Sequence, residues 1–299
     1  MKKPVIILVD GKWMAYRAHY AHMQLKTSGG RPSGLVFGFL KELLAINKRK
    51  PACPIIICWD GNGETWRHRA YPAYKANRTE NPDWKIMKAQ IDELLPTLQV
   101  GLGMHVARVD GVEADDIIGI LAHHLKVTHN VVVYSADRDM YQLVGDSVKV
   151  WQKLEDRLWG QKDVQAWLGA PISAFVEIKA MAGDPADNLK GLPGIGFKKA
   201  LKLYSSGFGM YGAANIALWD KYAKDLPRLK QELRLVRIVT DCDSKAWNAT
   251  QRTKLKQLVE RIKSRPTRSD GSVKFFYRFL GRYECDHLFE VRDRFWKIP

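Results

Sequence analysis

Aspartates follow three short apolar runs of this sequence. VIILVDG places Asp10 after the first run, IIICWDG places Asp60 after the second, and VVVYSADRD places Asp137 and Asp139 after the third. A single aspartate in such a place commonly caps a helix or closes a turn, because its side chain accepts hydrogen bonds from free backbone N–H groups. Three runs that end in the same way favour a shared acidic site, since parallel strands bring their carboxyl ends to one edge of a sheet.

A second group of acids opens the stretch GVEADDIIGILAHHL, where Glu113, Asp115 and Asp116 precede an apolar helical run. A helix cap and compensation of the helix dipole explain one or two of them. At about 100° per residue, Glu113 and Asp116 fall to one side of the buried stripe and Asp115 points well away from both. We therefore expect unequal roles, with one acid meeting the first two strand-end aspartates and another reaching toward the last two.

A further pair, Asp184 and Asp187, lies in AMAGDPADNL and brings the set to nine acids. Crowded carboxylates raise one another's pKa unless cations neutralise them. Oxygen ligands without His or Cys suit Mg²⁺ or Mn²⁺ rather than zinc. Two such ions about 4 Å apart can activate water and stabilise a leaving oxygen in phosphodiester hydrolysis. The acids therefore predict a two-metal hydrolytic site.

The overall charge has the opposite sign. The 299 residues include 48 Lys and Arg against 32 Asp and Glu, a formal net charge of +16, which favours a polyanionic partner such as nucleic acid. No apolar run approaches the roughly 20 residues of a membrane-spanning helix, and the opening apolar run is too short for a signal peptide. We expect no membrane partner and a cytosolic protein. The four cysteines are scattered, which fits neither a zinc pattern nor a disulfide framework.

Two basic segments could hold a nucleic-acid strand. GLPGIGFKKA has the spacing of a helix-hairpin-helix, whose backbone N–H groups approach a phosphate, although an ordinary helix connection is the alternative. Its relevant residues are Gly191, Gly194, Gly196, Lys198 and Lys199. TWRHRAYPAYKANR interleaves aromatic and basic residues, as suits an unpaired strand, or else forms a surface loop whose aromatics enter the core. Its candidates are Arg67 and Arg69 for DNA binding, and Lys75 and Arg78 for stabilising charge on the reacting phosphate.

The elements that must position these residues alternate between strand and helix. Residues 5–9, 55–59 and 131–134 have the continuous apolar pattern of parallel strands, and residues 35–46 and 117–125 between them have helical periodicity. This order predicts an α/β fold, with a parallel sheet flanked by helices. The stripe in residues 83–98 predicts a further amphipathic helix that packs on the core.

The pattern changes after Val150. Helical stretches interrupted by Gly and Pro predict a mainly helical second part, so we divide the chain into an α/β core at 1–170 and a helical part at 171–299. The helix-hairpin-helix at 191–200 belongs to the second part. No low-complexity linker separates the two, and they are expected to form one body. The basic run at 245–268 suits a solvated face, with a DNA-backbone contact as the alternative.

The motifs together resemble the 5′-nuclease family, which includes the 5′-nuclease domain of bacterial DNA polymerase I, phage 5′-3′ exonucleases and flap endonucleases. The matching stretches, in order, are ILVDG, YKANR, GVEADD, SADRD, GDPADN and GLPGIG. They cover roughly the first 200 residues. The resemblance implies a PIN-like sheet and an enzyme that cleaves phosphodiesters with divalent metal ions.

The resemblance also implies individual roles. It assigns the first metal site to Asp10, Asp60, Glu113 and Asp115, and the second to Asp137, Asp139, Asp184 and Asp187. Asp116 matches an acid close to both sites. Tyr74, Lys75 and Arg78 match a helical arch or gateway that engages the scissile phosphate. The glycines from 191 to 196 match the hairpin that grips duplex DNA, where K⁺ binds through backbone carbonyls.

The function that we predict is a structure-selective 5′ nuclease, acting as a 5′-3′ exonuclease and on 5′ flaps at single-strand/double-strand junctions. Its cofactors are two or more Mg²⁺ ions, with Mn²⁺ as a substitute. Its partner is DNA with a 5′ flap, a nick or a 5′ end, or RNA-primed DNA. It is expected to act as a monomer in the cytosol of a bacterium or a phage-infected bacterium. The alternative is a non-catalytic protein that binds DNA junctions, and a PIN-like ribonuclease is disfavoured by the GLPGIG element.

Overall fold

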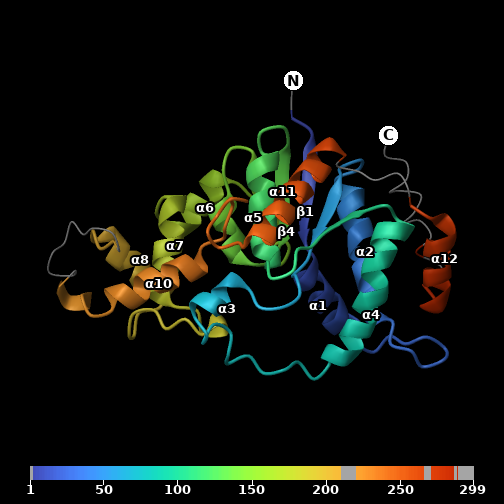
Figure 1. Cartoon of the computed structure of the whole chain (residues 1–299), viewed down its shortest axis with the longest axis horizontal. Helices are drawn as coiled ribbons and strands as arrows, with labels where there is room; N and C mark the ends of the chain where they lie inside the picture. The colour runs from blue at the N-terminus through green and yellow to red at the C-terminus, as the bar shows by residue number, and fades with distance from the viewer. Residues whose placement is uncertain (1–2, 210–219, 266–270, 286–287, 289–299) are drawn as a thin grey trace.

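The β-branched runs form strands of one mixed sheet (Figure 1). Branched side chains favour this setting because they pack well on a pleated surface. The fold is that of a computed structural model whose described residues are 3–209, 220–265, 271–285 and 288. The strands are β1 (Val5–Asp10), β2 (Ile55–Cys58), β3 (His105–Ala107), β4 (Asn130–Ser135), β5 (Val148–Gln152) and β6 (Arg157–Trp159).

Helices cover both faces of this sheet and make up most of the second half. The α-helices are α1 (Gly11–Ala21), α2 (Gly34–Arg49), α3 (Trp66–Ala70), α4 (Trp84–Pro96), α5 (Ala114–Leu125), α6 (Gln161–Leu168), α7 (Phe175–Ala182), α8 (Phe197–Ser205), α10 (Leu226–Val236), α11 (Ala249–Ser264) and α12 (Val273–Arg282). A π-helix, η1 (Thr97–Gly101), continues α4, and the 3₁₀ turns are η2 (Arg138–Leu143), η3 (Ile172–Ala174) and η4 (Pro185–Asp187).

The predicted strands are confirmed as β1, β2 and β4, whereas the sequence pattern does not predict β3, β5 and β6. β3 has only three residues, and β5 alternates exposed Lys149 with buried neighbours. β6 is a short antiparallel edge strand with one buried residue, so it lacks the continuous apolar pattern of a central strand. β6 lies beyond Val150 but within the predicted α/β core at 1–170, and the elements described after it are helices, as the mainly helical second part predicts.

The order of the strands defines a ligand edge. The sheet runs β3-β2-β1-β4-β5-β6, and β1 pairs in parallel with β2 on one side and with β4 on the other. The order therefore reverses between β1 and β4, and in open parallel sheets ligands bind outside the carboxyl ends of the strands at such a switch point. Asp10 ends β1 and Ser135 ends β4. The predicted acids follow the strand ends on this edge.

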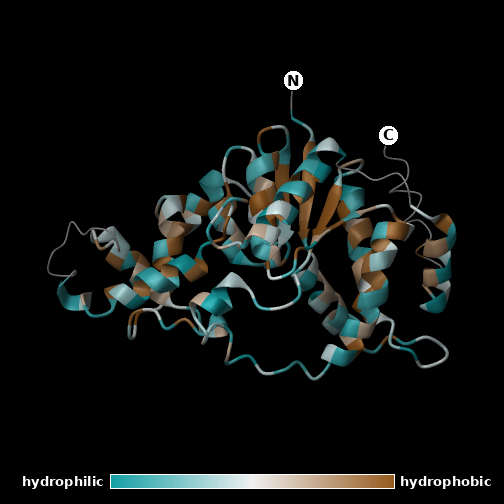
Figure 2. Ribbon diagram, viewed as in Figure 1, coloured by the Kyte–Doolittle hydropathy of each residue, from teal (hydrophilic) through white to brown (hydrophobic). Residues whose placement is uncertain are grey.

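Alternate residues of β1 face opposite helical layers. Ile6 and Leu8 pack in one apolar cluster with α5, and Ile7 and Val9 pack in the other with α1 and α2. Figure 2 shows the apolar strands between helices whose outer sides are largely hydrophilic. The sheet is covered on both faces, which is why its strands are apolar along their whole length.

Helix α5 is held between the sheet and the segment that follows α10. Ile117, Leu121 and Leu125 are fully buried, as the periodicity predicts. On another side of the helix, a Cβ atom at Gly119 would lie 2.4 Å from Cγ2 of Ile238, so only glycine allows this close approach. The first turn of α5, which carries three of the predicted acids, is thus fixed in position against the ligand edge.

The remaining helical predictions are confirmed with small changes of length. Residues 35–46 lie in α2, and residues 83–98 form α4 with the start of η1, where Met87, Ile91 and Leu94 are buried. α12 packs against η1 through Phe276. In the mainly helical second part, α10 ends at Val236, because the chain beyond it turns to pack along α5.

One apolar cluster contains residues from both sides of position 170, from β1 to α11. The division of the chain at that position stays a prediction. Within the part of the chain that the structure describes, no helix combines the length and the apolar character needed to cross a membrane.

Candidate active site

The carboxyl ends of β1 and β4 are joined through Asp10. Oγ of Ser135 donates to Oδ2 of Asp10 at 2.9 Å, and the N–H of Trp13 donates to Oδ1 at 3.0 Å. Asp10 therefore caps α1 and also faces the switch point, so both interpretations of a strand-end aspartate hold for it. Burial raises the pKa of Asp10 to about 6, more than its two hydrogen bonds lower it, and the negative charges of Asp137 and Asp60 add to the rise.

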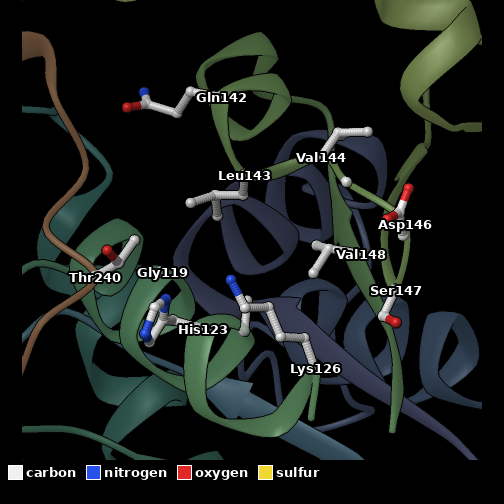
Figure 3. A pocket seen from close by; sticks show the side chains of 12 residues that line it. Gly119, His123, Lys126, Gln142, Leu143, Val144, Asp146, Ser147, Val148 and Thr240 are labelled. Atoms are coloured by element: carbon white, nitrogen blue, oxygen red, sulfur yellow. The ribbon is translucent and has the colours of Figure 1, made fainter. Parts of the chain in front are cut away.

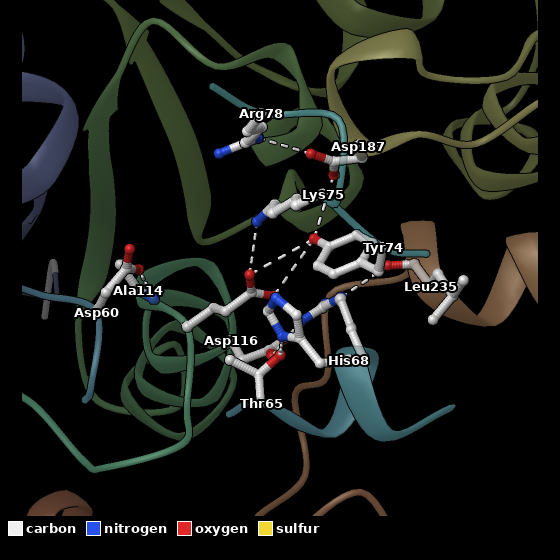
Figure 4. A network of polar contacts seen from close by, with 12 residues as sticks. Asp60, Thr65, His68, Tyr74, Lys75, Arg78, Ala114, Asp116, Asp187 and Leu235 are labelled. Carbon is white, nitrogen blue, oxygen red and sulfur yellow. Dashed lines mark hydrogen bonds and ion pairs between the residues drawn. The ribbon is translucent and has the colours of Figure 1, made fainter. Parts of the chain in front are cut away.

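Asp60, which follows β2, caps α5 from a different part of the chain. Its Oδ1 accepts a hydrogen bond from the N–H of Ala114 at 2.8 Å (Figure 4). Its Oδ2 accepts one from Nζ of Lys12 at 2.6 Å. Glu113 occupies the N-cap position of α5 but makes no side-chain cap hydrogen bond. Because Asp60 serves a free N–H group of the helix, Glu113 is available for other contacts.

The acids at the start of α5 point in two directions, as the helical spacing predicts. Glu113 and Asp116 both accept hydrogen bonds from Arg67. Asp115 instead faces the acids that follow β1, β2 and β4, and its burial together with their charges raises its pKa well above the ordinary value. One acid therefore meets both sets of strand-end aspartates, where the sequence predicts a separate acid for each.

Arg67 of α3 lies inside the protein and is only 3% exposed. Its guanidinium donates to both oxygens of Asp116 at 2.6 and 2.9 Å, and to the backbone oxygens of Leu235 and Arg237 at 2.8 and 3.0 Å. The prediction that Arg67 contacts DNA is therefore corrected, because its donors are directed at buried protein groups. The ion pair joins α3, α5 and the end of α10.

Asp116 is fully buried at the centre of this ion pair. Besides Arg67, it accepts the ring N–H of Trp66 at 3.2 Å and the backbone N–H of Val239 at 2.9 Å. These contacts use both carboxylate oxygens. The side chain of Asp116 is turned toward α3 and anchors the surrounding segments, and its closeness to both metal sites stays a prediction.

Glu113 stays ionised although it is buried. Nζ of Lys75 donates to one of its oxygens at 2.6 Å, and Arg67 donates to the other. Burial opposes ionisation, but the two cations outweigh it and hold the pKa of Glu113 at about 2. Glu113 therefore lies between the interior ion pair and the side chains that face the ligand edge.

The second group of acids surrounds Lys179 of α7. Asp137 caps η2 by accepting the N–H of Asp139 at 2.8 Å, while Nζ of Lys179 pairs with Asp139 and, at 3.1 Å, with Asp184. Burial and the charge of Asp137 raise the pKa of Asp139 to about 7, despite the lysine. For Asp184, burial is outweighed by Lys179, which lowers the pKa of its carboxyl.

The segment at 71–78 docks on the turn that contains η4. The phenol of Tyr74 is 3.2 Å from Oδ2 of Asp187, and Arg78 donates to Oδ1 of Asp187 at 2.7 Å. Figure 4 shows Lys75 between these groups and the start of α5. The resemblance implies a helical arch or a gateway here, and residues 72–77 form successive turns, with Lys75 in the left-handed region at φ +56°. The segment lies beside the acid cluster, and its role as a gateway stays a prediction.

Protein cations stand among the predicted metal ligands. The pairs are Lys12 with Asp60, Lys75 with Glu113, Lys179 with Asp139 and Asp184, and Arg78 with Asp187. In this arrangement, and among the described residues, no three acidic, His or Cys side chains converge closely enough to hold a metal ion. The donor set nevertheless fits hard divalent cations, because it consists of oxygens and because burial and mutual repulsion raise the pKa of three members, Asp10, Asp115 and Asp139.

Lys12 and Lys179 belong to this site, although the sequence analysis does not single them out. Lys12 lies in the first turn of α1, two residues after Asp10, and Lys179 lies in the last turn of α7, five residues before Asp184. The signal that could have found them is a lysine within one helical turn or so of a predicted acidic ligand. The helix then carries both to the same edge of the sheet.

The glycine turn between α7 and α8 uses its glycines in two ways. Gly191 has φ +61°, and a Cβ atom there would lie 2.4 Å from the backbone nitrogen of Gly183. Its N–H donates to Glu232 at 2.9 Å. The expectation of a phosphate contact at Gly191 is therefore corrected to a packing role. Gly194 and Gly196 are exposed, with open space around the position of a Cβ, and stay predicted phosphate contacts.

Charged side chains hold this turn from both sides. Glu232 of α10 is 1% exposed and also accepts the N–H of Lys190 at 3.0 Å, which the sequence analysis does not foresee. Nζ of Lys199 donates to the carbonyl oxygen of Gly194 at 3.1 Å, and both Lys199 and Lys198 are exposed. Of the two predicted lysines, Lys198 is directed to the surface and Lys199 stabilises the turn.

Comparison with known proteins identifies the family. Residues 5–169 match the family model described as 5′-3′ exonuclease, N-terminal resolvase-like domain. The chain belongs to the 5′-3′ exonuclease family. It is therefore a nuclease, and the resemblance drawn from the motifs is confirmed.

Individual relatives agree with this assignment. The 5′-3′ exonuclease of Buchnera aphidicola is 34% identical over 205 residues, which cover 68% of this chain and 71% of that protein. DNA polymerase I of Pseudomonas aeruginosa is 35% identical over 244 residues, 78% of this chain but only 26% of the polymerase. A solved complex of the bacteriophage T5 flap endonuclease with DNA and metal ions has a TM-score of 0.70 at 20% identity, covering 87% of this chain and 98% of that one, and shows the same fold.

A basic groove lies on the far side of α3 in this exonuclease-family chain. It has a volume of about 620 Å³ and is lined by Trp66 and Trp247 together with four cations and no acid. The cations are Arg69, Arg234, Arg237 and Lys245. Arg69, unlike Arg67, is exposed. The groove is a surface at which a phosphate backbone can be bound.

A further pocket, of about 490 Å³, lies near the other end of α5 (Figure 3). His123 and Lys126 of α5 line it together with Asp146 and Thr240. None of the predicted site residues lines this pocket. It lies apart from the acid cluster and offers a location for matched control variants.

Proposed function

We propose that this nuclease is a divalent-metal-dependent, structure-selective 5′ nuclease that cleaves DNA near single-strand/double-strand junctions. The observation that carries the proposal is the meeting of acids from the ends of β1, β2 and β4 with Asp115 at the start of α5. Their burial and mutual repulsion raise the pKa of Asp10 and Asp139 to about 6 and about 7. Such a concentration of negative charge in a chain of formal net charge +16 favours bound cations.

The ligands that we propose fall into two groups. Asp10, Asp60, Glu113 and Asp115 would hold one ion, and Asp137, Asp139, Asp184 and Asp187 the other. Two Mg²⁺ ions, or Mn²⁺ in their place, would supply activation of water and stabilisation of the leaving oxygen. A bound divalent cation would take over the carboxylates that now pair with protein cations. The ammonium groups of Lys12, Lys75 and Lys179 would then be free to turn toward phosphate oxygens.

Lys75 and Arg78 are the residues that we assign to the reacting phosphate. They lie on the gateway at 71–78, and each is paired with a proposed metal ligand, Lys75 with Glu113 and Arg78 with Asp187. A lysine at this point offers a positive charge to a non-bridging oxygen, and an arginine offers two N–H groups in a fixed geometry. Tyr74 is buried and positions the gateway through Asp187 rather than acting as a general acid.

Strand binding is assigned to two surfaces. The basic groove beside α3 would bind a phosphate backbone through its four cations. The turn between α7 and α8 would bind duplex DNA through Gly194, Gly196 and Lys198, with K⁺ at the turn's backbone carbonyls. The family relatives favour this partner, since the T5 flap endonuclease was solved with DNA and metal ions. These contacts hold the backbone without reading sequence.

The test compares end-labelled flap, nicked, RNA-primed and single-stranded substrates in Mg²⁺ and in EDTA. Cleavage of flap and nicked DNA in Mg²⁺ alone is expected. Asp137→Asn should lower turnover by at least about 100-fold, because it removes a ligand, while the dissociation constant for DNA stays nearly unchanged. Asp146→Asn, an exposed aspartate of the Figure 3 pocket, is the matched control and should retain full activity.

Two outcomes would contradict the proposal. Unchanged turnover of Asp137→Asn at saturating Mg²⁺ would refute the two-metal assignment. Tight binding of junctions by the unaltered chain without any Mg²⁺-dependent product would instead support a DNA-binding protein without catalysis.

A further inference from the structure

An aromatic pocket opens beside the second group of acids. It lies between η2, α6, α7 and α8, and its volume of about 630 Å³ is within the range of ligand-binding cavities. Asp139 and Lys179 belong to its lining, so the pocket is continuous with the acid cluster. None of the roles assigned above uses its aromatic rings or Arg138.

A cluster of aromatic rings, tilted or edge-on to one another, forms one side of this pocket. The ring centroids of Trp167 and Phe197 are 5.5 Å apart, with 31° between the ring planes. Trp167 also lies 5.5 Å from buried Tyr141 and 6.4 Å from Phe175, which is 1% exposed. Trp167 and Phe197 themselves are partly exposed and line the cavity. The buried rings behind them hold their faces in a fixed orientation.

Positive charge surrounds the rings. The guanidinium of Arg138 lies 5.3 Å from the ring centroid of Trp167, and exposed Lys198 lines the pocket as well. The sequence DRD in η2 places Arg138 between Asp137 and Asp139, so neighbouring residues face the rings and the acids. Flat apolar faces with cations beside them fit a planar base that carries an attached phosphate.

We propose that this pocket binds one unpaired nucleobase of the substrate strand, stacked against Trp167 and Phe197, with an adjoining phosphate held by the cations Arg138 and Lys198 beside the acid cluster. The proposal rests on the proposed function, because the acid cluster has to be the place where the strand is cut. The pocket of Figure 3 differs from the aromatic pocket, since no Phe, Tyr or Trp lines it.

The pocket provides a physical reason for selectivity toward junctions. A base can lie flat on Trp167 or Phe197 only when it has left the duplex stack, and a base at a flap or an end leaves that stack more easily than one in the middle of a duplex. Stacking is tolerant of sequence, because every base has an aromatic face. The pocket therefore selects for strand structure and not for base identity.

The test combines a change in the DNA with a change in the pocket. A single abasic site is moved through the nucleotides on either side of the scissile phosphate, and kcat/KM is measured for the unaltered chain and for Phe197→Ala. In the unaltered chain, an abasic site at one position should lower kcat/KM by about 5- to 150-fold, the usual range for one stacked base. In Phe197→Ala, an abasic site at that same position should lower kcat/KM only by roughly twofold, because the ring with which the base interacts is already absent.

Phe275→Ala is the matched control, since Phe275 is a 37% exposed phenylalanine of α12, away from the pocket. In this control variant, the abasic site should lower kcat/KM as much as it does in the unaltered chain. A second measurement does not depend on cleavage: 2-aminopurine at the identified position should lose fluorescence when the unaltered chain binds in EDTA, and should lose less with Phe197→Ala. Melting temperatures establish that each variant is folded.

The outcomes separate this inference from the proposed function. If the intact DNA is cleaved with Mg²⁺ but no abasic position is sensitive to Phe197→Ala, the base pocket is refuted and the nuclease assignment stands. If Phe197→Ala abolishes the fluorescence change while no DNA is cut under any condition, the pocket stands and the proposed reaction fails.

Discussion

Replacing Arg67 by methionine tests the corrected assignment of this residue most directly. Methionine has a similar unbranched shape but no charge. In the variant, the Asp116 carboxylate stays at 0% side-chain exposure and keeps only the N–H donors of Trp66 and Val239. Glu113 keeps Lys75 as a partner, so Asp116 is the group that loses its neutralising cation.

The size of the effect follows from this burial. Removing one partner of a buried ion pair costs about 3–5 kcal/mol of folding free energy. With an unfolding entropy of about 2.1 cal/mol/K per residue, a chain of 299 residues should lose about 5–8 °C in melting temperature. Adding Asp116→Asn removes the unpaired charge while its Oδ1 can still accept the N–H of Val239. The double variant should therefore regain at least about half of the melting temperature that Arg67→Met loses.

The assay measures thermal unfolding and the salt dependence of DNA binding for the same variants. Arg69→Met is the matched control, because Arg69 lies on the same short helix but is exposed and lines the basic groove. It should leave the melting temperature almost unchanged and reduce the slope of log K against log salt concentration by about 0.9 for duplex DNA. Because Arg67 is buried, Arg67→Met should leave the slope of log K against log salt concentration unchanged. An unchanged melting temperature together with a reduced slope for Arg67→Met would refute the buried role.

Three further predictions concern the acids. Asp10→Asn, which can still cap α1, should stabilise the protein in EDTA. The pKa of Asp10 in the folded protein, about 6, lies above the ordinary 3.8, so its ionisation destabilises the fold as the pH rises through this window. Urea unfolding should show that the variant is more stable by about 3 kcal/mol at pH 8 and gains nothing at pH 3.5. Glu232→Gln leaves one buried N–H of the glycine turn without its acceptor and should cost about 1–3 kcal/mol, with faster hydrogen exchange at Gly191; equal exchange would contradict the contact. Asp115→Asn should abolish cleavage in a folded protein. Asp116→Asn should instead lower stability and leave turnover per folded molecule nearly unchanged. Equal losses of turnover in the two variants would contradict the conclusion that Asp115 and Asp116 point in different directions.

Local signals explain why much of the fold could be predicted. The strands β1, β2 and β4 are buried on both faces, and this burial requires the continuous apolar runs that the sequence displays. β3 and β6 are three residues long, too short for any pattern to stand out. The helices α2, α4 and α5 each bury an apolar stripe, and their periodicity therefore identifies them.

The acid cluster was predictable for a related reason. A residue that directly follows a parallel strand lies on the ligand edge whatever the neighbouring elements are, so the positions of Asp10, Asp60 and Asp137 follow from their places in the chain. The helical angle of 100° per residue likewise separates Asp115 from Glu113 and Asp116 before any partner is known.

The tertiary structure alone decided which charges meet. Nothing near Arg67 in the sequence distinguishes it from Arg69, yet packing of α3 against α5 and α10 buries the first and leaves the second exposed. Gly191 and Gly194 belong to the same turn, yet Glu232, distant in the chain, reaches only the N–H groups at the start of that turn. The physical reason is the distance along the chain over which each effect acts. Strand direction and helical period act over a few residues and determine the edge or face on which a side chain lies. Burial and ion pairing depend on elements that are distant in the sequence and meet only in the folded protein.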